Sequence, residues 1–158
     1  MAAPTSESTT SAERELLLTR TLDAPRALVF RAWTDPEHLA RWWGPRGFTT
    51  PSCTMDVRPG GAWRICMRGP DGVDHWVQGV YREVVEPERL VTTWAWEQAD
   101  GSSGGETLLT VTLEERDGRT VLTLHQALFG DAVERENHQD GWSQALDRLA
   151  ADVVEARA

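Results

Sequence analysis

Residues 107–127 read TLLTVTLEERDGRTVLTLHQA, two runs of alternating apolar and polar residues that meet at Asp117-Gly118. An Asp-Gly pair between such runs is typical of a two-residue β-hairpin turn. With this turn, Leu113 lies opposite Leu122, and the aliphatic side chains of both runs share one face while the threonines occupy the other. The segment therefore predicts two antiparallel strands with one apolar face.

The same alternation extends over residues 48–126, in five or six short runs separated by turn residues. The turns lie at Arg58-Pro59-Gly60-Gly61, Gly69-Pro70-Asp71-Gly72, Glu86-Pro87-Glu88, Asp100 to Gly105 and Asp117-Gly118. Connections this short join antiparallel neighbours, because a parallel crossover needs about a dozen residues or more. We therefore expect an antiparallel meander.

Two further hairpins have registers that gather apolar side chains on one face. We pair Val57 with Trp63, Met55 with Ile65 and Cys53 with Met67 in the first hairpin, and Val84 with Val91, Tyr81 with Trp94 and Gly79 with Trp96 in the second. Gly79 then lies under an indole, which leaves space on the inner face. A register that sets Cys53 opposite Cys66 is rejected, because it points Met55 towards Arg64.

The last element, residues 131–156, has an apolar stripe at three- and four-residue spacing, which predicts one amphipathic helix. The stripe comprises His138, Trp142, Ala145, Leu146, Leu149 and Val153. Gly141 interrupts it at a cost of about 1 kcal/mol relative to alanine. We expect a bend or a close approach to the sheet at this glycine.

The N-terminal part supplies a strand and two short helices. Residues 14–22 alternate as a first strand, Pro25 opens a helix, and Asp35-Pro36 starts a second short helix that ends at Gly44-Pro45. Residues 1–13 are rich in Ser, Thr and Ala, which predicts a disordered tail. The remaining residues, 14–158, suffice for one domain.

Charge and composition exclude several classes of function. The net charge is −9, which argues against nucleic-acid partners, since these need a clustered basic face. The chain contains no lysine, so Schiff-base chemistry and phosphate-loop lysines are excluded. It shows neither a secretory signal nor an apolar run long enough for a membrane span, and we expect a cytoplasmic protein.

Local motifs in this order resemble a known family. They comprise Ala24-Pro25-Arg26-Ala27-Leu28-Val29-Phe30, Ala32-Trp33-Thr34-Asp35-Pro36-Glu37, Arg41-Trp42-Trp43-Gly44-Pro45, Arg58-Pro59-Gly60-Gly61-Ala62-Trp63, Gly79-Val80-Tyr81-Arg82-Glu83-Val84, Pro87-Glu88-Arg89-Leu90-Val91 and Gly141-Trp142. The resemblance is to the SRPBCC superfamily, also called START-like or birch-pollen-allergen-like. Within it, the chain is similar to the branch of heat-shock-protein ATPase activator homologues, from about residue 14 to the end.

The resemblance implies an α+β helix-grip fold. In this fold a curved antiparallel sheet of about six or seven strands wraps round a long C-terminal helix, with two short helices after the first strand. The superfamily uses the cavity between sheet and helix for lipids, hormones, polyketides and other apolar molecules, and the resemblance implies no fixed catalytic residues.

An unusually aromatic set of residues is expected to face this cavity. Our candidate ligand-binding residues are Trp63, Met67, His75, Tyr81, Trp94, Trp96, His138 and Trp142. Pockets for small molecules are mostly apolar and aromatic, with a few polar groups for orientation. Cys53 and Cys66 do not form a metal-binding Cys-x-x-Cys pair, and we expect no metal and no cofactor.

Three hypotheses of function remain open, and the first is binding of an apolar or aromatic small molecule. The second is a cyclase or dehydratase in which two of His75, His138, Tyr81 and Glu83 lie within hydrogen-bond reach. For Glu83 we favour an ion pair with Arg89 instead. The third is a co-chaperone-like interaction module, or a homodimer, that uses exposed aromatics of Arg41-Trp42-Trp43-Gly44-Pro45.

Overall fold

The computed structural model describes residues 14–98, 100 and 104–157. The elements, in chain order, are β1 (Glu15–Leu22), α2 (Arg26–Thr34), α3 (Pro36–Leu39), β2 (Thr49–Met55), β3 (Ala62–Arg68), β4 (Asp74–Val85), β5 (Arg89–Trp96), β6 (Thr107–Arg116), β7 (Arg119–Ala127) and α4 (Ala132–Arg157). The tail predicted for residues 1–13 lies outside the described residues.

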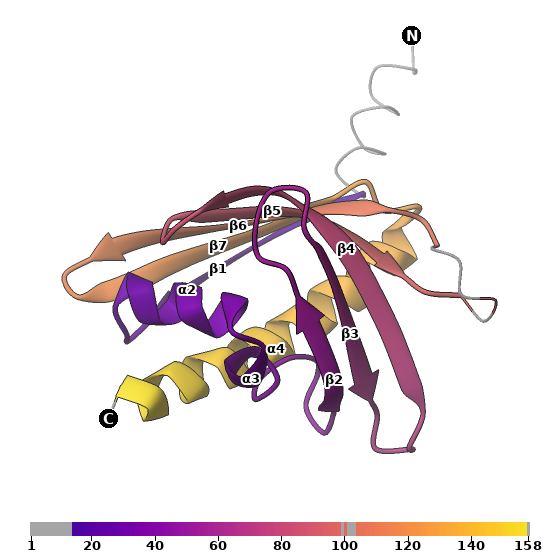
Figure 1. Cartoon of the computed structure of the whole chain (residues 1–158), viewed down its shortest axis with the longest axis horizontal. Coiled ribbons are helices and arrows are strands. Elements are labelled where there is room, and N and C mark those ends of the chain that lie inside the picture. The colour runs from indigo at the N-terminus through magenta and orange to yellow at the C-terminus, as the bar shows by residue number, and fades with distance from the viewer. Residues whose placement is uncertain (1–13, 99, 101–103, 158) are drawn as a thin grey trace, which may run out of the picture.

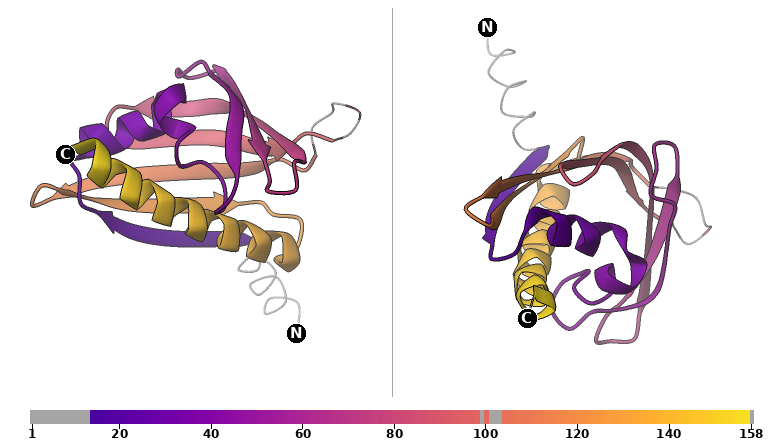
Figure 2. Two further views of the ribbon diagram at one scale, coloured as in Figure 1. Left: turned by 90° about the horizontal axis from the view of Figure 1, so that it is seen from below. Right: turned by 60° about the vertical axis from the view of Figure 1, so that its left-hand side comes forward.

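Within the described part of the chain, seven antiparallel strands form one sheet in the order β1-β7-β6-β5-β4-β3-β2. The sheet curves over α4, which runs along its concave side together with α2 and α3 (Figure 1). The right-hand view of Figure 2 looks nearly along the axis of α4 and shows β2, β3 and β4 curling down beside the short helices. The predicted helix-grip architecture is confirmed.

The core lies between the sheet and α4. Leu146, Leu149 and Val153 of α4 are fully buried, as the predicted stripe requires. They face a layer of aliphatic side chains from the long central strands, of which Leu122 and Leu124 are also fully buried. The inward residues in the middle of the β6–β7 hairpin are aliphatic and buried, whereas Thr107, Thr120 and Gln126 place buried polar groups towards its ends.

The β6–β7 hairpin has the predicted register. Leu113 pairs with Leu122, and the turn residues Asp117 and Gly118 have φ angles of 53° and 79°. Positive φ at both positions characterises the turn that matches the twist of the two strands. The local sequence was therefore sufficient to predict this hairpin.

The β2–β3 hairpin differs from the prediction by two residues. Met55 pairs with Trp63 and Cys53 with Ile65, so the apolar side chains share a face as predicted, but with other partners. The turn between the strands is closed by the Gly61 N–H, which donates to the Arg58 carbonyl at 2.8 Å, while the Gly60 N–H donates to the Tyr81 carbonyl on β4, also at 2.8 Å. Both cysteines are free, which agrees with our rejection of the register that would place them opposite each other.

The β4–β5 hairpin contains an irregularity that the sequence did not reveal. Tyr81 pairs with Thr92, whereas Glu83 pairs with Val91, so the register shifts between Tyr81 and Glu83. The predicted pairing of Val84 with Val91 is wrong by one residue, since Val84 pairs with Leu90, and the register shift makes the predicted pairing of Tyr81 with Trp94 wrong by two. The extra residue also turns the Glu83 side chain to the other face of the sheet.

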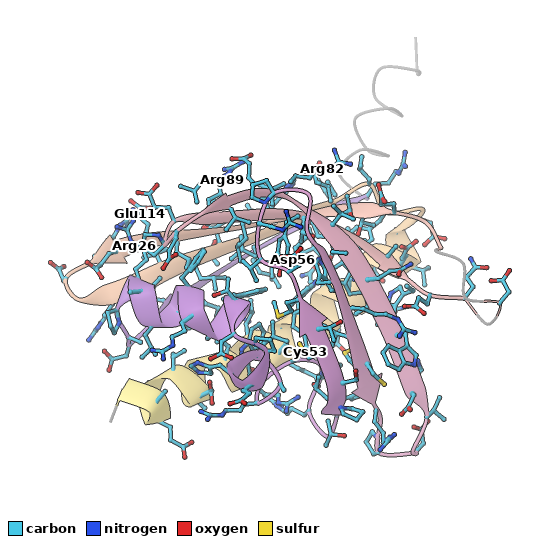
Figure 3. All side chains as sticks on the ribbon, viewed as in Figure 1. Arg26, Cys53, Asp56, Arg82, Arg89 and Glu114 are labelled. Carbon is cyan, nitrogen blue, oxygen red and sulfur yellow. The ribbon has the colours of Figure 1, made fainter. Side chains whose placement is uncertain are left out.

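Glu83 consequently lies outside the core. Its carboxylate is 3.4 Å from the Arg89 guanidinium, in the ion pair that we favoured. Figure 3 shows Arg82 and Arg89 on the convex side of the sheet.

Gly79 lies under an indole, but the indole belongs to Trp63, its partner on β3, and not to Trp96. A Cβ atom at this position would lie 2.6 Å from the Trp63 ring and 2.0 Å from the Thr93 carbonyl oxygen. The absence of a side chain at Gly79 is what allows Trp63 to lie flat on β4.

We expect Gly79→Ala to lower the free energy of unfolding by about 2–3 kcal/mol, because the methyl group overlaps a backbone oxygen and a packed ring. Urea denaturation followed by circular dichroism measures the change. Gly105→Ala is the matched control, since nothing lies within 4 Å of a Cβ there. Equal stability of the two variants would contradict the assigned close packing.

Candidate functional site

Five tryptophans meet where the short helices approach α4. We call Trp33, Trp42, Trp43, Trp63 and Trp142 the tryptophan cluster. Trp43 lies at its centre, with its ring centroid 5.3 Å from that of Trp142 and 6.3 Å from that of Trp63. Trp33 stacks on Trp142 at 5.9 Å with 29° between the ring planes. Aromatic pairs at these distances and angles attract beyond their buried area.

The predicted exposure of Trp42 and Trp43 is wrong. Trp42 is fully buried and its Nε1 donates to the Ala32 carbonyl at 3.1 Å, while Trp43 is 4% exposed. The segment that carries them is bound to α4 through Arg148, whose Nη1 donates to the carbonyls of Trp43, Gly44 and Pro45 at 2.9–3.1 Å. These two aromatics are therefore core residues and do not form an exposed interface.

Beside the cluster, between β3–β5 and α4, side chains leave a cavity of about 370 Å³. We call it the main pocket. Its walls are formed by Trp43, Gly44, Pro45, Phe48, Met67, His75, Trp94, Trp96, Glu134, Asn137, His138, Gly141, Trp142 and Ala145. The volume falls within the range of about 300–1,000 Å³ that is usual for small-molecule sites.

On the other side of Trp43 the interior is almost filled. The hollow there is about 30 Å³ and is lined by Trp63, Tyr81 and neighbouring aliphatic residues. That volume suits a single water molecule. Of the predicted ligand-binding residues, Trp63 and Tyr81 thus lie outside the main pocket, whereas Met67, His75, Trp94, Trp96, His138 and Trp142 line it.

Several lining residues were missed by the sequence reasoning. Glu134 lies four positions before His138 and Asn137 four before Gly141 on α4, so extending the same helix face towards its N-terminus would have found both. Trp43 was misplaced because its motif was interpreted as a surface. For Phe48 no local signal was available, since it lies in the irregular segment before β2.

Buried polar groups hold two of the tryptophan walls in place. Trp142 Nε1 donates to Gln126 Oε1 at 2.8 Å, and Gln126 Nε2 donates to Thr107 Oγ1, also at 2.8 Å. Thr107 Oγ1 donates in turn to the Trp94 carbonyl at 2.9 Å. Gln126 is fully buried, so this chain of hydrogen bonds links α4 through β7 and β6 to the strand that carries Trp94.

His138 forms the polar part of the wall. Its ring packs against Trp94 and Phe129, at centroid distances of 4.7 and 4.9 Å, and its Nε2 accepts a hydrogen bond from Trp96 Nε1 at 3.2 Å. Burial lowers the pKa of His138 to about 4. At neutral pH the ring is therefore uncharged, with the proton on Nδ1 and the lone pair of Nε2 directed at Trp96.

The four residues proposed for proton transfer are not brought together. Tyr81 lies in the small hollow, where burial raises its pKa, and Glu83 lies on the convex face. His75 is exposed at the mouth of the main pocket. Among the residues that the structure describes, no hydrogen bond joins any two of these groups, so the geometry that the cyclase hypothesis requires is not met by them.

In residues 14–98, 100 and 104–157 no three His, Cys, Asp or Glu side chains are placed to hold a metal ion. No helix in those ranges combines the length and the apolar composition that crossing a membrane requires.

We expect the free energy of unfolding to fall by roughly 2–3 kcal/mol between about pH 6.5 and pH 4 through His138 alone. The unfolded chain binds a proton in that range, whereas the folded protein excludes it from the buried ring. His138→Gln keeps an acceptor for Trp96 and removes the titration, so its stability falls less. Urea denaturation at a series of pH values measures the effect. Parallel curves for the wild type and His138→Gln would refute the assignment.

Comparison with known proteins agrees with the fold. The family model described as activator of Hsp90 ATPase homolog 1-like protein matches residues 23–153. No curated protein matches the chain significantly. Three solved structures from bacteria are similar to it over nearly their full length.

The first, from Chromobacterium violaceum, is 35% identical, with 89% of this chain and 96% of that chain covered and a TM-score of 0.79. An AHSA1 protein from Silicibacter pomeroyi is 28% identical, with coverage of 90% and 99% and a TM-score of 0.81. A protein from Nitrosomonas europaea is 25% identical, with coverage of 92% and 97% and a TM-score of 0.79. The chain therefore belongs to the family of activator of Hsp90 ATPase homolog 1-like proteins, within the SRPBCC fold class that its sequence motifs resemble.

Proposed function

We propose that this protein binds an apolar or aromatic small molecule in the main pocket. The observation that carries the proposal is a cavity of about 370 Å³ beside a core that is otherwise almost filled. The lining of this cavity is mostly aromatic and apolar, and a ligand of matching shape would make many dispersion contacts with it.

The walls are built to keep this cavity open. Trp142 is bonded to Gln126, Trp96 is bonded to His138, and Trp94 packs edge-to-face against Trp96 at 4.7 Å. The rings of Trp142 and Trp96 cannot rotate into the space without losing these hydrogen bonds. Such preorganisation lowers the entropic cost of binding. The SRPBCC fold class, which often binds hydrophobic ligands, supports the same function.

Gly141 contributes to the opening of the pocket by having no side chain. It lies in the wall within α4, which continues through it as one helix, and it faces Pro45. The expected close approach to the sheet is therefore not what the structure shows. The one neighbouring atom within 4 Å of a Cβ at this position would be Pro45 Cγ at 3.8 Å, an ordinary contact. A larger side chain there would extend into the cavity without displacing the backbone.

We expect Gly141→Leu to weaken binding of a neutral aromatic probe, N-phenyl-1-naphthylamine, at least about tenfold, because the new side chain occupies ligand volume. The fluorescence rise of the probe on entering an apolar site measures its dissociation constant. Helix propensity favours leucine over glycine, so the variant should be as stable as the wild type or more so.

Ala151→Leu is the matched control, since Ala151 is an exposed residue of the same helix. It should bind the probe as the wild type does. Saturable binding that is unchanged in Gly141→Leu would place the probe elsewhere, and an absence of saturable binding to the wild type would count against the pocket function.

A further inference from the structure

The lining of the main pocket is unevenly charged. It contains one carboxylate, Glu134, and no arginine, and the chain has no lysine. Glu134 is half-buried, and its Oε2 accepts a hydrogen bond from the Gly130 N–H at 3.1 Å, which holds the carboxylate in position. The neighbouring cation, Arg135, is directed to Glu136 and Gln139. In the described part of the chain, no arginine forms an ion pair with Glu134.

Away from the exposed His75 at the mouth, no other side chain in the described wall offsets this charge at neutral pH. His138 is uncharged there, because burial lowers its pKa to about 4. The N-terminus of α4 carries a partial positive charge of about half a unit, but Asp131 already caps it, accepting from the Glu134 N–H at 2.8 Å. The side of the pocket next to the start of α4 is therefore negative, in a protein whose net charge is −9.

The remaining walls present the kind of surface that attracts cations. Trp43, Trp94, Trp96 and Trp142 all line the cavity, and a tryptophan ring is the best aromatic partner for a cation because of the negative potential at its face. The cavity therefore offers a cation two attractions at once, that of the four indole faces and that of the Glu134 carboxylate. An anionic amphiphile such as a fatty acid would find no arginine to pair with and would be repelled by Glu134.

We propose that the main pocket is selective for organic cations, with a substituted ammonium group held against the tryptophan faces and Glu134 as its counter-ion. This inference rests on the proposed function, because it names the chemical class of the ligand that occupies that cavity. The apolar part of the ligand fills the space towards Met67 and Phe48, and the charged part lies on the side of α4.

The test compares three probes of closely similar shape and different charge: phenyltrimethylammonium, the neutral tert-butylbenzene and the anionic benzenesulfonate. Binding is followed by intrinsic tryptophan fluorescence at about pH 8 and at low salt, where charge attraction is least screened. We expect the cation to bind about tenfold more tightly than the neutral probe, and benzenesulfonate to bind more weakly than either.

Glu134→Gln should reduce the preference for the cation to about twofold or less while leaving the affinity for tert-butylbenzene unchanged. The glutamine retains a carbonyl oxygen for the Gly130 N–H, so the start of α4 is preserved, which circular dichroism verifies. Glu136→Gln is the matched control, because it removes a carboxylate that lies outside the pocket lining. It should keep the full preference.

The two proposals fail in different ways. Binding of tert-butylbenzene or benzenesulfonate as tightly as the cation, or a preference that survives in Glu134→Gln, would overturn the cation selectivity and leave the pocket function standing. If none of the three probes binds and N-phenyl-1-naphthylamine does not bind either, both proposals are overturned.

Discussion

The binding of the segment 41–45 to α4 is the constraint on which the site depends. One guanidinium, that of Arg148, donates to three successive carbonyls, from Trp43 to Pro45, and thereby fixes a segment without regular secondary structure. Trp43 is held at the centre of the tryptophan cluster as a result. Its ring separates the filled part of the interior from the main pocket, so a polar contact made outside the cavity defines where the cavity begins.

Rigidity of the aromatic walls follows from hydrogen bonds that are buried with them. Gln126, Thr107 and Trp142 satisfy one another inside the protein, since none can be hydrated there. The indole N–H of Trp94 has no hydrogen-bond acceptor among the described residues, and this ring instead meets Trp96 at 89° and His138 at 75°. Edge-to-face packing of this kind is favourable for aromatic rings and limits how far the wall can relax into the pocket.

Strand pairing was predicted correctly where the residues of the connecting turn set the register. It was predicted wrongly where contacts with a neighbouring strand set it. The pairing of Leu113 with Leu122 depends on the Asp117-Gly118 turn between them, which is a local signal. The pairing of Tyr81 with Thr92 depends on a register shift in β4, which alternation of apolar residues does not reveal. Glu83 illustrates the consequence, since one extra residue moves its side chain from the predicted inner face to the outer one.

The sequence by itself determined the order of the elements, the curved antiparallel sheet, the long helix and most of the aromatic pocket wall, including Trp94, Trp96, His138 and Trp142. The order of the elements follows from periodicity and turn chemistry, which act over short distances along the chain, whereas the curvature of the sheet round the helix was implied by the family resemblance. Only the tertiary structure decided that Trp43 separates two hollows, that Tyr81 lies on the filled side, and that Glu134 stands without an arginine partner in the described part of the pocket wall. Volume and charge balance are properties of residues brought together from several elements, and no single segment of the chain specifies them.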